Sequence, residues 1–372
     1  MGLTFNGKMP AAIQIGGKQV DNIVMNGEIV WPAQPTGPDY FYIENLYNYP
    51  STIRITKYGT PTTGTTLEYS YDKINWNTCV YNSNGLCNIS NIVDKVYFRS
   101  SDGFSTRYNY YYINCTYGKI GAGGDLRTLL DYTNDNLNTT SDYCFSSMFA
   151  TTNQTYRENL IDISKIDFSK LINLTLGCYS NMFYYNRKLT STPSILPATN
   201  LAESCYDYMF ANSGIQTPPL LPATTMAKRC YAGMFLGSTL SQPPVLQSTN
   251  LAESCYSSML SQCNKLTTVP LLPATTLVKD CYQEMFRSSK NITETPVLPA
   301  TRLSSDCYYQ MFDGCESLNK IYTYATSWNS SYAHYWVRNV SSTGDFYNLG
   351  GATNIPSGES GIPTNWTVHT SL

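Results

Sequence analysis

Apolar side chains recur at a fixed spacing through most of the chain after residue 119. Seven segments share a Cys, an aromatic residue directly after it, and a Met four positions after it. The cysteines are Cys144, Cys178, Cys205, Cys230, Cys255, Cys281 and Cys307, and the corresponding methionines are Met148, Met182, Met209, Met234, Met259, Met285 and Met311. Successive cysteines are 25 to 34 residues apart. Self-similarity at this period predicts a solenoid whose coils bury the Cys and Met side chains between them.

The pattern within one unit of about 26 residues predicts a short strand followed by a short helix. Leu201, Cys205 and Met209 stand four residues apart, which would place them on one face of a helix. A Leu-Pro-Ala-Thr motif precedes this segment at 196–199 and recurs in later units. Its Pro would end a strand and its Thr would cap the helix. With coils about 4.8 Å apart, side chains stack in parallel rows, which favours free buried thiols over disulfides.

Four regions follow from these patterns. Residues 1–34 contain short strand-like runs around an Asn-Gly turn, and they predict a β-hairpin anchor and oligomerisation segment. Residues 35–118 predict a small Ig-like β-sandwich. Three more cysteines lie there and their pairing stays open: Cys79, Cys87 and Cys115. The solenoid is predicted over 119–320 and a Trp-rich C-terminal cap over 321–372. The predicted fold class is β-rich α+β.

Charge and hydropathy exclude several classes of partner. The 24 basic and 26 acidic residues are scattered along the chain, whereas nucleic acids and anionic membranes require clustered Lys and Arg. No apolar run is long enough for a membrane span or a signal peptide. We therefore expect synthesis in a cytoplasm, without membrane insertion and without export by the usual route.

The residues needed for common chemistry are sparse. His334 and His369 are the only histidines, and the cysteines lack the close pairs of a zinc site. No phosphate-binding loop or nucleophile motif occurs, so we expect no catalytic, cofactor-binding or metal-binding residues and no enzyme activity. One enzymatic alternative remains: Glu203 and Glu253, two coils apart, could act as the carboxylate pair of a polysaccharide-cleaving enzyme.

The positions two and three residues after each repeat Cys differ from coil to coil, while the Cys and Met do not. This difference suggests that the variable positions face solvent and carry recognition. The candidates with the largest polar or aromatic side chains are Asp207, Tyr208, Gln283, Glu284, Tyr309 and Gln310. An equally simple interpretation is that these residues only face solvent.

Two segments resemble known families. The run Met-Phe-Asp-Gly-Cys-Glu-Ser-Leu at 311–318, preceded by Leu-Pro-Ala-Thr at 298–301, resembles the BspA-like class of leucine-rich repeat proteins of gut bacteria and their phages. This resemblance covers about 140–368, although the first step of 34 residues and the Leu-Gln-Ser-Thr at 246–249 depart from the pattern. Residues 15–20 and 25–31 resemble virion-anchoring segments of phage tail and fibre proteins.

These resemblances imply a function in surface recognition. The leading hypothesis is a virion structural protein, a tail or head fibre component that binds a glycan or protein on the host surface. Its partners would be other virion proteins, contacted through 1–34, and copies of itself in a homotrimer. A bacterial cell-surface adhesin is the first alternative, and a fibre-borne polysaccharide depolymerase is the second.

Overall fold

A computed structural model describes residues 39–58, 66–101, 103, 110–151 and 159–372. Of the chain before residue 39 it describes only the backbone of four short strands. These strands are β1 (Gln14–Ile15), β2 (Lys18–Gln19), β3 (Ile23–Met25) and β4 (Glu28–Trp31). β1 pairs with β2 and β3 with β4, both antiparallel. The other features predicted for 1–34, including its role in oligomerisation, lie outside the described residues.

Nine strands form two sheets at the N-terminal end of the described chain. They are β5 (Phe41–Asn45), β6 (Ser51–Tyr58), β7 (Glu68–Ser70), β8 (Asn77–Thr78), β9 (Leu86–Ile92), β10 (Lys95–Arg99), β11 (Tyr110–Tyr117), β12 (Ile120–Asp125) and β13 (Leu160–Asp167). One sheet has the order β13-β12-β5-β10-β7-β8 and the other β11-β6-β9. Residues alternate between the interior and the surface along β10, so that Val96 and Phe98 are fully buried. The two sheets enclose one apolar core.

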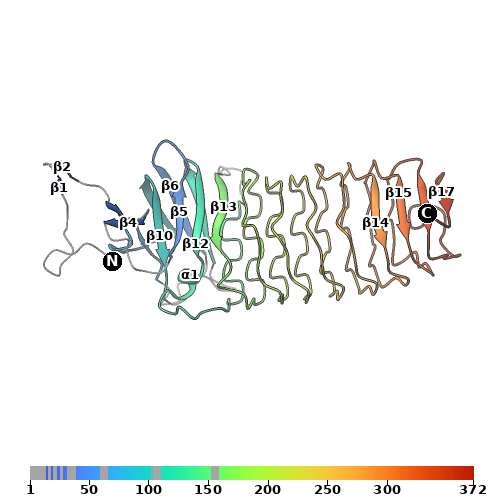
Figure 1. The fold of residues 1–372 in the computed structure, drawn as a ribbon, viewed down its shortest axis with the longest axis horizontal. Helices are drawn as coiled ribbons and strands as arrows, with labels where there is room; N and C mark the ends of the chain where they lie inside the picture. Colours follow the sequence, from blue (N-terminus) through green and yellow to red (C-terminus); the bar gives the residue numbers. More distant parts are fainter. Residues whose placement is uncertain are drawn as a thin grey trace.

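Strand β12 joins this sandwich to the repeats. It is buried along its whole length, and a side chain at Gly123 would collide with the ring of Tyr42. β12 pairs antiparallel with β5 on one side and parallel with β13 (Leu160–Asp167) on the other. Across this junction Lys165 forms an ion pair with Glu44 at 2.7 Å. The sheet therefore passes without interruption from the sandwich into the first coil (Figure 1).

The prediction of one helix per coil is wrong. Among the residues that the structure describes, the single α-helix is α1 (Arg127–Asp131), which lies outside the repeat units. The Cys-to-Met segments consist of turns, and every fourth residue has a left-handed backbone, as at Ser204 (φ 53°), Tyr208 (φ 53°) and Asn212 (φ 56°). The fold is therefore almost entirely β strands and turns rather than α+β.

Hydrogen bonding explains why turns replace the helix. Alternate backbone N–H groups bond three residues back within the coil, as from Met209 N to Tyr206 O at 3.2 Å. The intervening N–H groups bond to the next coil, as from Phe210 N to Met234 O at 2.9 Å. The stack thus satisfies backbone groups that a helix would satisfy internally. A repeat of four-residue turns also places Leu201, Cys205 and Met209 at equivalent positions. The apolar pattern is therefore compatible with a helix and with a series of turns.

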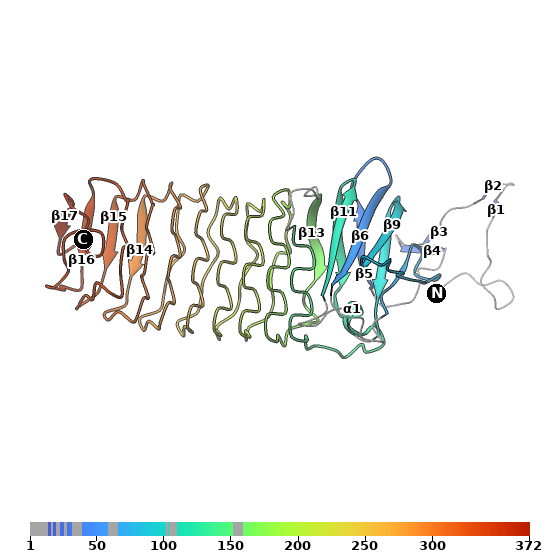
Figure 2. The ribbon, with the colours of Figure 1, turned by 180° about the vertical axis from the view of Figure 1, so that it is seen from behind.

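The opposite side of each coil carries extended segments that bond little to one another. Between β13 and β14 (Glu294–Leu298) the contacts include isolated bridges such as Ile195 to Leu220. Each of these segments contains prolines, which donate no backbone hydrogen bond. Regular parallel pairing resumes at β14 and continues through β15 (Lys320–Thr323), β16 (Asp345–Asn348) and β17 (Thr367–His369). Coils thus continue through the region predicted as a separate cap (Figure 2).

The interior of the solenoid consists of rows of equivalent side chains. All seven repeat cysteines and all seven repeat methionines are 0% exposed, and the thiols are free. The aromatic residues after the cysteines stack in a column from Phe145 to Tyr308, with neighbouring ring centres 5.5 to 6.4 Å apart. This spacing exceeds the roughly 4.8 Å expected from sheet geometry. The stacked rings are therefore spaced more widely than the strands of a regular sheet.

A tryptophan ends this column. Ala333 occupies the position of the column tyrosines in the next coil, and Trp336 occupies the position of Met311. The indole of Trp336 covers the ring of Tyr308 at 6.0 Å and donates a hydrogen bond to Gly361 O at 2.8 Å. Trp336 is fully buried. Ala333 in place of a column tyrosine leaves room for the Trp336 indole, which ends the aromatic column before the last coils.

Candidate functional site

The six residues predicted as a recognition surface lie on the turn side, and none is fully exposed. Asp207 and Gln310 are buried, and the other four are half-buried. Tyr208, Glu284 and Gln310 also occupy left-handed backbone positions. Glu284 N donates to Tyr309 O at 2.8 Å, so the later four residues share two adjacent coils. Asp207 and Tyr208 lie three coils before the coil of Gln283 and Glu284.

Packing and pairing restrict these side chains. Asp207 accepts a hydrogen bond from Arg229 Nη2 at 3.1 Å, and Tyr309 stacks on the ring of His334 at 6.1 Å. Burial raises the pKa of Asp207 to about 6, although Arg229 opposes this shift. The residue type at these positions therefore varies from coil to coil because the contacts with neighbouring coils differ, and not only because the positions are exposed.

A more open and regular surface lies on the other side of the coil. It consists of the residues ten, eight and six positions before each of the five repeat cysteines from Cys205 to Cys307, together with their equivalents in the coil of β15. We call it the outer face. The aliphatic row contains Ile195, Leu220, Val245, Leu271, Val297 and Tyr322; the proline row contains Pro197, Pro222, Gln247, Pro273, Pro299 and Tyr324; the threonine row contains Thr199, Thr224, Thr249, Thr275, Thr301 and Thr326. The side chains of all three rows are exposed or half-buried.

These rows arise because successive side chains of an extended chain point alternately inward and outward. Leu196 and Ala198 point inward and are 1% and 2% exposed, whereas Ile195 and Thr199 on either side of them are exposed. In the coil whose motif reads Leu-Gln-Ser-Thr, Ser248 takes the inward position. Its hydroxyl donates to Thr224 O at 3.0 Å, which satisfies the buried polar group. The irregular motif therefore preserves the outer face.

The outer face combines apolar and hydroxyl groups without charge. Leu271 is 78% exposed, Val245 58% and Leu220 54%, values that are unusual for three equivalent aliphatic residues on neighbouring coils. All six threonines are exposed, and their hydroxyls can donate and accept hydrogen bonds. No Asp, Glu, Lys or Arg occurs in the three rows. Such a surface can bind an uncharged partner through apolar contacts and hydrogen bonds.

Aromatic rings extend the aliphatic row toward the C-terminal end. Tyr322 pairs in register with Val297, and its ring stacks on Tyr347 at 4.7 Å. Tyr347 stacks in turn on His369 at 4.7 Å, and His369 Nε2 lies 2.8 Å from Asp345 Oδ1. Charged side chains therefore lie close to the aromatic end of the row.

The proposed carboxylate pair lies in a ladder of alternating charges two residues before the repeat cysteines. Lys228 occupies the coil between Glu203 and Glu253, and Lys279 follows. Glu253 contacts Lys228 at 3.2 Å and Lys279 at 3.4 Å. The hydrogen bond from Lys228 lowers the pKa of Glu253, whereas a general acid needs a raised pKa. This geometry favours a structural ion-pair ladder over a catalytic pair.

The three cysteines of the sandwich are buried and free. The thiols of Cys79 and Cys87 are hydrogen-bonded to each other, whereas the Cys115 thiol donates to Tyr117 O at 3.1 Å. Cys79 directly follows β8 and Cys87 lies in β9, so these two thiols meet between the two sheets. The structure therefore places the thiols of Cys79 and Cys87 next to each other.

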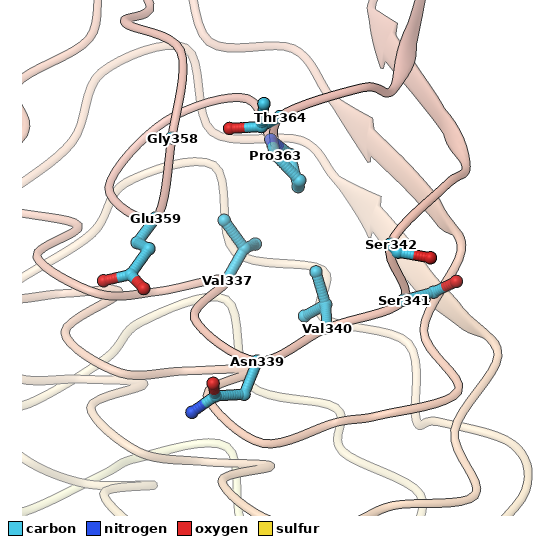
Figure 3. A pocket seen from close by; sticks show the side chains of 9 residues that line it. All are labelled: Val337, Asn339, Val340, Ser341, Ser342, Gly358, Glu359, Pro363 and Thr364. Atoms are coloured by element: carbon cyan, nitrogen blue, oxygen red, sulfur yellow. The ribbon is translucent and has the colours of Figure 1, made fainter.

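A hollow of about 160 Å³ lies near the C-terminal end (Figure 3). Val337 and Val340 lie at its centre, Asn339 and Glu359 on one side, and Ser341 beside Ser342 on the other. Its volume is below the roughly 300 Å³ at which small-molecule sites usually begin. We therefore place the candidate site on the outer face.

Within the part of the chain that the structure describes, no three His, Cys, Asp or Glu side chains gather in a geometry that could hold a metal ion. No helix among those residues has the length and hydropathy to cross a membrane. No protein-family model, curated protein or solved structure matches the chain.

Proposed function

We propose that the chain is a structural component of a bacteriophage virion, a tail or head fibre that binds the surface of the host bacterium. The observation that carries this proposal is the outer face, which repeats one set of uncharged side chains over six coils. A surface of this length suits an extended, non-covalent contact rather than a reaction at one point. The solenoid would serve as an arm, and the outer face would bind a host glycan or protein.

Two further features support this proposal. The sheet runs from the sandwich into the solenoid through β12 and β13, which makes the two regions one stiff unit. All twelve cysteines are free and buried, which suits a protein made and assembled in a reducing cytoplasm. In this proposal residues 1–34 attach the chain to other virion proteins and hold three copies together.

Immunogold labelling of purified phage particles tests the location. We expect antibodies against the solenoid to label the particles, and unlabelled particles would reject a virion protein. Labelling of bacterial cells without phage would instead favour a cell-surface adhesin with the same binding face. Release of new reducing ends from host polysaccharide would favour the depolymerase.

Adsorption of the purified full chain to bacteria tests the binding face. A charge in the middle of an apolar contact is costly because it must lose its water, so Leu271→Asp should weaken adsorption roughly tenfold. Val93→Asp is the matched control, because Val93 is an aliphatic residue of the sandwich that is 72% exposed and lies off the outer face. Equal adsorption by the two variants would exclude the outer face as the binding surface.

A further inference from the structure

The outer face presents nearly the same groups once per coil, and this regularity constrains its partner. On the sheet side neighbouring coils approach to the spacing of adjacent strands, because Ile195 forms a parallel bridge with Leu220 and β14 pairs in parallel with β15. One sugar residue in an extended polysaccharide has a similar length. A linear glycan aligned with the solenoid axis could therefore repeat the same contact on each coil.

The chemistry of the three rows also suits a glycan. Aliphatic and proline side chains can pack against the C–H faces of sugar rings, and threonine hydroxyls can hydrogen-bond to sugar hydroxyls. At the C-terminal end Tyr324, which is 41% exposed, replaces proline and adds an aromatic surface. Acidic sugars are usually held by Arg or Lys, and no such residue occurs in the three rows.

A protein partner fits this face less well. Protein interfaces obtain most of their binding energy from a few central Trp, Tyr or Arg residues in shaped pockets. The first five coils of the outer face have no such residue, and their aliphatic, proline and threonine positions are close to identical. Equal small contributions along a row suit a repetitive ligand, because affinity then increases with the number of coils engaged.

We propose that the outer face binds a neutral, linear polysaccharide that runs along the solenoid axis, with about one sugar residue per coil. This inference rests on the proposed function and specifies its ligand. The threonine row provides the hydrogen bonds, and the aliphatic and proline rows provide the apolar contact.

Enzymatic and chemical treatment of bacteria separates this inference from the proposed function. On a strain that adsorbs the full chain, periodate oxidation of surface sugars should abolish adsorption, and proteinase treatment should leave it unchanged. The opposite result would overturn the glycan inference while retaining a host-binding fibre. Failure to adsorb to the host before any treatment would overturn both.

Glycan arrays test the ligand class and the role of the hydroxyls. We expect binding to neutral linear glycans that increases with chain length to about six sugars, one per coil of the outer face, and little change between low and high salt. The double variant Thr224→Val, Thr275→Val should lose binding roughly tenfold. Thr78→Val, which changes an exposed threonine in β8 of the sandwich, should not.

Three results would contradict the inference. They are a preference for acidic glycans, binding that does not depend on chain length, and equal binding by the threonine variants and the wild type. A further outcome is self-association through the same face. If sedimentation shows an oligomer that Leu271→Asp dissociates, the occupant is a second copy of the chain, and the glycan inference fails.

Discussion

The turn side of the solenoid contains a buried carboxylate whose ionisation should weaken the fold. Asp207 is 9% exposed, and its pKa is raised from 3.8 to about 6 by burial, despite the ion pair with Arg229. The folded state therefore binds this proton more tightly than the unfolded state does. The resulting stability is fully present below pH 3.8 and is lost as the pH rises through about 6.

The loss of folding free energy can be calculated from the pKa shift of Asp207. One pKa unit corresponds to about 1.4 kcal/mol, so a shift from 3.8 to about 6 corresponds to about 3 kcal/mol at most. Asp207→Asn imitates the protonated side chain and can still accept the hydrogen bond from Arg229. At about pH 7 the variant should therefore be more stable than the wild type by up to about 3 kcal/mol, and near pH 4 by much less.

Urea denaturation at several pH values between about 4 and 7 measures this difference. Asp313→Asn is the contrasting control, because Asp313 is buried between Arg338 at 2.7 Å and Arg287 at 3.5 Å. Its neutralisation removes the buried carboxylate that both arginines contact and should lower stability at neutral pH. A destabilised Asp207→Asn protein at pH 7, or a constant difference across the pH range, would refute the reasoning.

Three more predictions concern buried groups. The Tyr231 hydroxyl is buried without a hydrogen-bond partner, so Tyr231→Phe should leave thermal stability unchanged or raise it by about 1 kcal/mol; a loss would reveal a partner. Trp336→Ala should lower the free energy of unfolding by about 3–5 kcal/mol and should make the backbone amides in the coil of Tyr308 exchange faster. Exchange as slow as in the wild type would show that Trp336 does not cover the aromatic column. Glutathione disulfide, which accepts the two electrons and two protons, should join Cys79 to Cys87; peptide mapping that finds another pair would contradict this assignment.

The stacking of coils could be predicted from the sequence, but the path of the chain within a coil could not. An apolar residue at every fourth position is compatible with a helix and with a repeat of four-residue turns. The signal that separates them lies in Gly233, Gly237 and Asn212, which are poor residues for the interior of a helix. All three occupy left-handed backbone positions in the structure. Gly233 and Gly237 stand four residues apart, and Asn212 occupies the position of Gly237 one coil earlier, a pattern that indicates turns.

The outer face was missed for a related reason. The sequence of the Leu-Pro-Ala-Thr motif predicts the end of a strand and the cap of a helix, and this local role does not indicate an exposed surface. With no helix to cap, the threonine at 199 and its equivalents face solvent. The variable positions after each Cys predict a recognition surface on the turn side instead, although Asp207 and Gln310 are buried there. Which side of a coil is open depends on packing against neighbouring coils, and the sequence of one unit does not contain that information.

The central claim is that six coils stack in register and present one continuous outer face. Nitroxide labels on Thr199→Cys and Thr326→Cys, the two ends of the threonine row, test it by electron paramagnetic resonance. Five steps of about 5 Å predict a narrow distance distribution near 25 Å. The native thiols, which are all buried, should remain unlabelled in the Thr199→Cys single variant. A broad distribution, or a mean distance far above this value, would contradict the stacked arrangement and the outer face with it.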